Sequence, residues 1–163
     1  MGAPTRIVYG GMKVSSNEPV EKSVFKPQFG QEWSDIEKVF CILVHNLFGR
    51  GFEELKKALS LILDEDRAAI AGPILVELIQ GTRTPEEKET IKTVTRGIHW
   101  LSVSDDHWHK AAEMAFALRR KGITSPAIDT LIAVLAIDYR CILLHKDSHF
   151  ELISRNSQLR CYP

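Results

Sequence analysis

Three acidic residues stand in or beside apolar segments of this chain, where charged side chains are uncommon. Glu77 is the only charge in the run Ile-Leu-Val-Glu-Leu-Ile at 74–79. Asp129 falls in the first turn of an expected helix, and Asp147 comes three residues after an apolar run. A buried carboxylate without a partner costs free energy, so we expect each of them at a cleft edge, in an ion pair or on a cation.

Each acid also has an ordinary explanation when it is taken alone. Glu77 can pair with an arginine, and Asp129 is favoured by the dipole of the helix that it begins. Together, at the ends of successive elements, they predict a shared cation site in which Glu77, Asp129 and Asp147 are the metal ligands. Carboxylate oxygens suit Mg²⁺ or Mn²⁺ better than zinc. A zinc or other transition-metal site at His145, Asp147 and His149 is an alternative, but it lacks a cysteine partner or a further helical histidine.

The elements that must position these acids alternate between strands and helices. We expect strands at 40–44, 68–71, 100–103, 141–144 and 159–162. Helices are expected from about Phe52, from Pro73, from Thr84 with a capping box to Glu87, from Ser104 or Asp105, and from Ser125-Pro126. This alternation predicts an α/β fold whose central parallel sheet is flanked by helices. Such sheets collect their chemistry at the carboxyl ends of the strands.

The chain changes character near residue 39. Residues 1–38 show no sustained period of 3.6 or 2 and contain turn-forming pairs such as Gly10-Gly11 and Lys26-Pro27. We therefore predict an irregular N-terminal extension over 1–38 and a single domain over 39–163.

Composition sets further bounds. Lys plus Arg and Asp plus Glu both number 21, so RNA binding would need a local basic patch or bridging metal ions. The basic run Arg119-Arg120-Lys121 is such a candidate, although the C-terminal end of a helix also favours these charges. Cys41, Cys141 and Cys161 include no C-x-x-C pair, which favours buried, reduced thiols. With no apparent signal peptide or apolar span, we expect a cytoplasmic protein without a membrane segment.

Three ordered segments carry a resemblance to a known family. They are GPILVELIQG at 72–81, LRRKGITSPAIDTLIA at 118–133 and LLHKDSHF at 143–150. They resemble the segments that carry the second, third and fourth metal-binding acids of PIN-domain ribonucleases of the VapC toxin type. The resemblance covers about 110 residues, from about Gly51 onward.

This resemblance implies a PIN-like three-layer sandwich and a metal-dependent endoribonuclease that cleaves RNA. It also implies a toxin held inactive by a protein antitoxin, and a homodimer. Glu77, Asp129 and Asp147 are then ligands of Mg²⁺ or Mn²⁺, directly or through water. The metals would activate water, orient the scissile phosphate and neutralise the leaving oxygen. Arg119, Arg120 and Lys121 would contact the RNA backbone.

The chain departs from the family pattern at the first acid. An Asp is expected directly after the first strand, but the strand here is followed by His45-Asn46-Leu47-Phe48. His45 offers a nitrogen ligand without a negative charge. One explanation is a PIN-like module that has lost its nuclease chemistry and binds an antitoxin or RNA, and another is an altered reading frame or start ahead of Gly49. A different phosphodiesterase or a DNA nuclease is a third hypothesis.

Overall fold

The computed structural model describes residues 6–9, 12–15, 40–42 and 53–162. Its central feature is a five-stranded sheet in the order β5-β4-β3-β6-β7, in which every neighbouring pair is parallel. The strands are β3 (Phe40–Ile42), β4 (Ala68–Ala71), β5 (His99–Leu101), β6 (Ile142–Leu144) and β7 (Arg160–Cys161). The predicted parallel sheet is confirmed.

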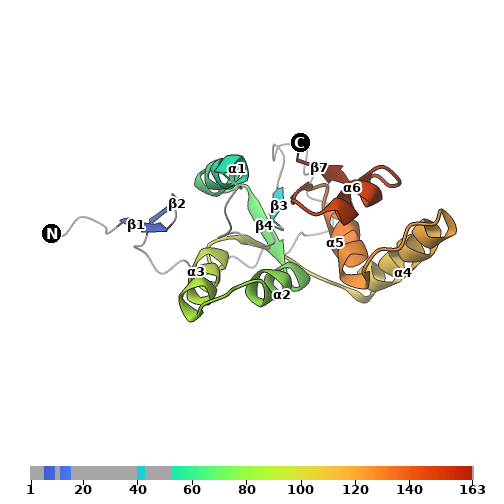
Figure 1. Ribbon diagram of the computed structural model, residues 1–163, viewed down its shortest axis with the longest axis horizontal. Helices are drawn as coiled ribbons and strands as arrows, with labels where there is room; N and C mark the ends of the chain where they lie inside the picture. Colours follow the sequence, from blue (N-terminus) through green and yellow to red (C-terminus); the bar gives the residue numbers. More distant parts are fainter. Residues whose placement is uncertain (1–5, 10–11, 16–39, 43–52, 163) are drawn as a thin grey trace.

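Six helices of the described region connect and cover these strands. They are α1 (Glu53–Asp64), α2 (Gly72–Gln80), α3 (Pro85–Thr95), α4 (Asp105–Arg120), α5 (Ala127–Asp138) and α6 (Ser148–Ser154). In Figure 1, α1 lies on one side of β4, and α2 and α3 lie on the other. Helix α5 contacts α2, α4 and α6. The arrangement is the predicted α/β sandwich with helices on both faces of the sheet.

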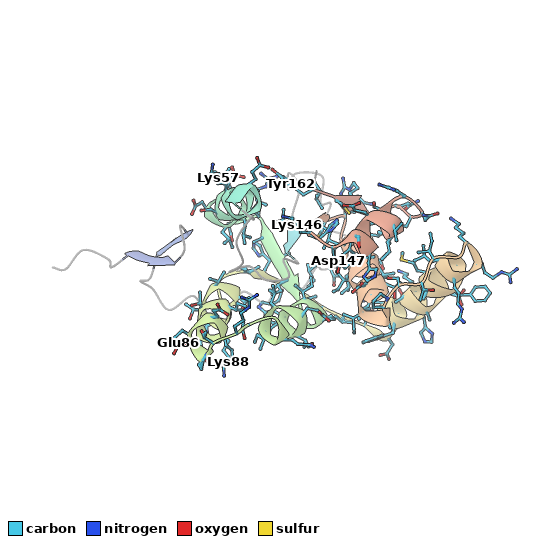
Figure 2. The ribbon with its side chains drawn as sticks, viewed as in Figure 1. Lys57, Glu86, Lys88, Lys146, Asp147 and Tyr162 are labelled. Carbon is cyan, nitrogen blue, oxygen red and sulfur yellow. The ribbon has the colours of Figure 1, made fainter. Side chains whose placement is uncertain are left out.

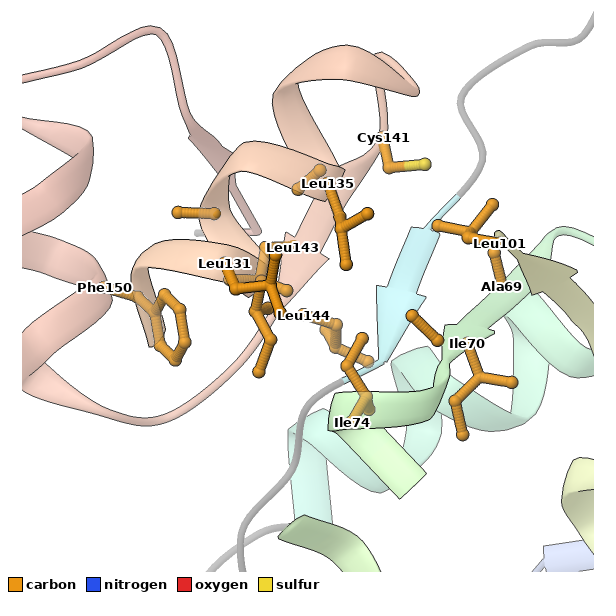
Figure 3. Packing of buried hydrophobic residues seen from close by; sticks show 14 of the residues in the cluster. Ala69, Ile70, Ile74, Leu101, Leu131, Leu135, Cys141, Leu143, Leu144 and Phe150 are labelled. Atoms are coloured by element: carbon orange, nitrogen blue, oxygen red, sulfur yellow. The ribbon is translucent and has the colours of Figure 1, made fainter. Parts of the chain in front are cut away.

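The core is centred on α5 and strands β4 and β6. Every residue from Thr130 to Ala136 in α5 is buried, so this helix is covered on all sides. The apolar side chains of β4 and β6 and the ring of Phe150 pack with it in one cluster (Figure 3). A helix held this tightly fixes the position of any polar residue in its first turn.

Local capping explains where α3 begins and corrects one detail of the prediction. Thr84 is the N-cap, and its hydroxyl accepts a hydrogen bond from the Glu87 amide at 3.2 Å. The Glu87 carboxylate, however, accepts from the amide of Arg83 at 2.7 Å, one residue before the cap. The expected capping box is therefore only half formed, because Glu87 reaches past Thr84.

Strand β5 and helix α6 differ most from the prediction. Strand β5 occupies His99–Leu101 rather than 100–103, because the chain after Leu101 turns into the Ser104 cap of α4. Helix α6 was not predicted at all. It is a seven-residue helix in which Phe150 and Ile153 are buried, too short for a helical period to stand out from its neighbours. Of the strand expected at 40–44, Leu43 and Val44 lie outside the described residues.

The N-terminal segment contains regular structure where none was predicted. Strands β1 (Arg6–Tyr9) and β2 (Met12–Ser15) pair antiparallel, with Tyr9 opposite Met12. The prediction of an irregular segment is wrong for these residues, since two four-residue strands are too short to show a clear period of 2. The intervening pair Gly10-Gly11 is of the kind that two-residue hairpin loops favour. A domain boundary at 38/39 stays a prediction.

Two cysteine side chains lie in the described part of the chain, and its helices can be checked for membrane-spanning character. Cys141 is buried and Cys161 is partly buried, and both are free thiols. Burial raises the pKa of the Cys161 thiol, which keeps it protonated. Cys41 lies in β3, but its side chain is outside the description. Within the described residues, no helix combines the length and apolar character needed to cross a membrane.

Candidate metal centre

Asp147 lies between β6 and α6, at the carboxyl edge of the sheet (Figure 2). It is the N-cap of α6, and its Oδ1 accepts a hydrogen bond from the His149 amide at 2.9 Å. Its side chain is 34% exposed, so solvent and ligands reach the carboxylate. The position predicted from the strand end is therefore correct, and the local cap explains why the side chain is held in place.

The Asp129 side chain comes from α5 and lies in the same site as Asp147. It lies in the first turn of that helix, where the N-terminal end favours a negative charge. Its side chain is only 13% exposed. Because the next seven residues of α5, 130–136, are all buried, the Asp129 carboxylate is held at a fixed position.

His149 joins the two carboxylates. Its Nδ1 lies 3.2 Å from Asp129 Oδ2 and 3.3 Å from Asp147 Oδ1. Among the described residues, Asp129, Asp147 and His149 form a group whose potential ligand atoms all lie within 4.8 Å of one another. The sequence placed the two acids in a site, but it did not favour His149. The sequence feature that could have indicated His149 is the Asp-x-His spacing. When the Asp is the N-cap of a helix, the histidine two residues later lies close to its carboxylate.

His145, the other histidine of this segment, takes a different role. Its Nδ1 accepts a hydrogen bond from the Asp147 amide at 3.2 Å, and its ring packs against Phe150 at a centroid distance of 5.2 Å. Burial lowers the pKa of this imidazole and favours its neutral form. The alternative set of His145, Asp147 and His149 is thus not the group that the fold assembles, since Asp129 takes the place of His145.

Glu77 lies on α2, which begins directly after β4 and contacts α5. It is partly buried, next to Leu78 and one turn after Ile74, both of which are buried. The group of close donor atoms found among the described residues does not include Glu77. Its role as a ligand, directly or through water, stays a prediction.

The basic run Arg119-Arg120-Lys121 lies at the C-terminal end of α4 and is exposed. Lys121 Nζ donates to Asn156 Oδ1 at 3.5 Å, which connects the run to the segment after α6. The other two side chains extend the positive surface at the helix end, where such charges are favourable. Their contact with RNA remains a prediction.

The arrangement of donors fits a divalent cation. Two carboxylates and one imidazole converge from α5 and from the segment that follows β6. Strand β3 is the direct neighbour of β6, with Ile42 in register with Leu144. The residues that follow β3, including His45, lie outside the described residues, and the sequence from 43 to 52 contains no Asp or Glu. Fold and site together define a parallel-sheet α/β protein with an acidic site at the carboxyl edge.

Comparison with known proteins identifies the class further. The chain is 34% identical over 103 residues to VapC ribonuclease Mb1587 of Mycobacterium bovis and to ribonuclease VapC11 of Mycobacterium tuberculosis. Each match spans 61% of this chain and 77% of the relative. No model of a protein family matches the sequence.

Solved structures share the fold. DNA-bound VapBC from Salmonella typhimurium aligns with a TM-score of 0.61 at 17% identity, over 77% of this chain and 98% of that one. VapBC-5 from Mycobacterium tuberculosis aligns with a TM-score of 0.54 at 19% identity, over 76% of this chain and 97% of that one. The PIN-like α/β fold is confirmed, and the chain belongs to the VapC ribonuclease family.

Proposed function

We propose that this protein is a divalent-metal-dependent endoribonuclease that acts as the toxin of a toxin–antitoxin pair. The observation that carries the proposal is the convergence of Asp129, Asp147 and His149 within 4.8 Å at the carboxyl edge of the sheet. It occurs in a chain whose sequence relatives are named ribonucleases. A close group of oxygen and nitrogen donors is the arrangement that a divalent ion needs.

In this proposal some residues bind the metal ion, and others bind the RNA substrate. Asp129, Asp147 and Glu77 would act as the catalytic residues by holding a Mg²⁺ or Mn²⁺ ion, Glu77 directly or through water. Such an ion would supply an activated water and neutralise charge on the phosphate. The Asp129 side chain is only 13% exposed, so its attraction to a cation would be screened little by solvent.

RNA binding requires a local positive surface, because the chain as a whole has no net charge. Arg119, Arg120 and Lys121 supply three adjacent cations on an exposed helix end. We assign them contacts with the RNA backbone, where they add affinity without reading sequence.

The proposed partners follow from a solved structure that shares the fold, VapBC-5, which is described as a member of the VapBC family of toxin–antitoxin systems. By analogy we propose that a protein antitoxin binds this chain and that the chain pairs as a homodimer. We further propose that it acts in the cytoplasm, where its RNA substrate and its reduced thiols both belong.

An RNA cleavage assay tests the proposal. The purified protein should cleave RNA with Mg²⁺ or Mn²⁺, lose the activity in EDTA, and lose it in Asp129→Asn. Asp105→Asn, an identical change at an exposed position in the first turn of α4, is the matched control and should stay active. Metal-independent cleavage, or an active Asp129→Asn protein, would contradict the proposal.

A second function is favoured by one specific observation. No acid occurs between residues 43 and 52, where the family pattern places the first ligand. A catalytically impaired module that binds an antitoxin or RNA would keep the fold and bind metal, yet leave RNA intact. Metal binding without cleavage of RNA would therefore support this function. Cleavage of DNA in preference to RNA would instead indicate a DNA nuclease.

A further inference from the structure

The His149 imidazole lies between the carboxylates of Asp129 and Asp147. Donor atoms about 2.1 Å from one ion and at adjacent octahedral positions lie about 3 Å apart. The separations from His149 Nδ1 to Asp129 Oδ2 and to Asp147 Oδ1 are 3.2 and 3.3 Å. Both separations are close to the spacing of neighbouring ligand atoms around one ion, and the three potential ligand atoms lie within 4.8 Å of one another.

The backbone holds the imidazole in this place. The His149 amide donates to Asp147 Oδ1, so the first turn of α6 and the carboxylate form one unit. The Nδ1 of His145, the other histidine of this segment, is already the acceptor of a hydrogen bond from the Asp147 amide. Within the part of the chain that the structure describes, the nitrogen donor of this group comes from His149.

We propose that His149 is a nitrogen ligand of the ion held by Asp129 and Asp147, and that it selects Mn²⁺ over Mg²⁺. This inference rests on the proposed metal-dependent function and adds the identity of the ion. Mg²⁺ prefers a shell made only of oxygen, whereas Mn²⁺, as a first-row transition ion, accepts an imidazole nitrogen more readily.

Pulsed electron paramagnetic resonance of the Mn²⁺-loaded protein tests this ligand directly. The wild type should show ¹⁴N modulation from a coordinated imidazole. The signal should be absent in His149→Ala and retained in His109→Ala, which removes an exposed histidine of α4. Circular dichroism establishes that each variant is folded.

Competition between Mn²⁺ and Mg²⁺ provides the second measurement. His149→Ala should lower the affinity for Mn²⁺ by about tenfold or more and change the affinity for Mg²⁺ less. His149→Asp replaces the nitrogen with an oxygen donor. It should keep metal binding, lose the ¹⁴N signal and shift the preference toward Mg²⁺.

The outcomes separate this inference from the function on which it rests. Bound Mn²⁺ without ¹⁴N modulation in the wild type would overturn the ligand and leave the nuclease proposal intact. Tighter Mn²⁺ binding in His149→Ala would also overturn it, because the imidazole would then be competing with the ion. Absence of Mn²⁺ binding to the wild type would overturn both, and the RNA assay in EDTA would report the loss of the function independently.

Discussion

At the scale of single residues, Asp147 has two roles that substitution can separate. Its side chain is a proposed ligand, and it also caps α6 through the His149 amide. Asparagine is as good an N-cap as aspartate but carries no charge. The two roles therefore respond differently to Asn and to Ala.

We expect Asp147→Asn to lose most of the Mn²⁺ affinity while its free energy of unfolding stays within about 0.5 kcal/mol of the wild type. Asp147→Ala should lose the affinity and also about 1 kcal/mol of stability, because the cap is gone. Urea denaturation without metal, together with calorimetric Mn²⁺ titration, measures both quantities. Equal stability of the Ala and Asn proteins would show that the cap is unimportant.

The residues of the site were only partly predictable from the sequence. Asp129 and Asp147 stood out because each borders an apolar segment, and the structure brings them together through His149. The role of His149 was ambiguous in the sequence. Its side chain lies in the site because it belongs to the first turn of α6, a short helix that was not predicted and that Asp147 caps. Glu77 stood out as strongly as the two aspartates, but its contribution depends on distances that spacing along a chain does not determine.

At the scale of elements, α5 is both the centre of the core and the carrier of Asp129. Leu135 is fully buried in this helix, two turns from the aspartate. The end of the helix is anchored as well: Asp138 Oδ2 lies 2.6 Å from Lys110 Nζ, and the Tyr139 hydroxyl donates to the Ser102 carbonyl at 2.9 Å. The geometry of the site therefore depends on packing far from the ligands.

We expect Leu135→Ala to lower the free energy of unfolding by about 2–5 kcal/mol, through lost burial and the cavity that it leaves. Asp129→Asn, in the same helix, should leave stability nearly unchanged or raise it, because it removes one of two neighbouring carboxylate charges. Thermal and urea denaturation of the metal-free proteins compare them. A large loss of stability in Asp129→Asn would mean that its ion pair with His149 matters more than we infer.

Most elements of the fold followed from the sequence, for physical reasons that also explain the exceptions. Long segments such as α4 and α5 show either a clear helical period or a continuous apolar run, and Pro and Gly mark their limits. Helix α6 and the β1–β2 hairpin have too few residues for a period to emerge. Strand order was not predictable in detail, since it depends on which strands pair across crossovers rather than on local pattern.

At the scale of the whole molecule, charge is balanced, so the proposed RNA binding would depend on a few local cations. Replacing Arg119, Arg120 and Lys121 together by Ala should weaken RNA binding and flatten its dependence on salt. Each lost phosphate contact lowers the slope of log K against log salt by about 0.7 for single strands, so the slope should fall by about 2.

Fluorescence anisotropy with labelled RNA at several salt concentrations measures this slope. Lys88 and Lys92 on α3, together with Arg96 at its C-cap, offer a control triple of equal charge at a different surface. Replacing those three by Ala should leave the slope unchanged. An unchanged slope in the Arg119, Arg120 and Lys121 triple would instead assign these cations to stabilising the end of α4.

The VapC-family fold brings Asp129 and Asp147 together, and we propose that the two carboxylates hold a divalent ion. Calorimetric titration of the wild type and Asp129→Asn with Mn²⁺ measures this binding directly. We expect saturable binding to the wild type and an affinity at least about tenfold weaker in the folded Asp129→Asn protein. Equal Mn²⁺ affinity in the two proteins would contradict it.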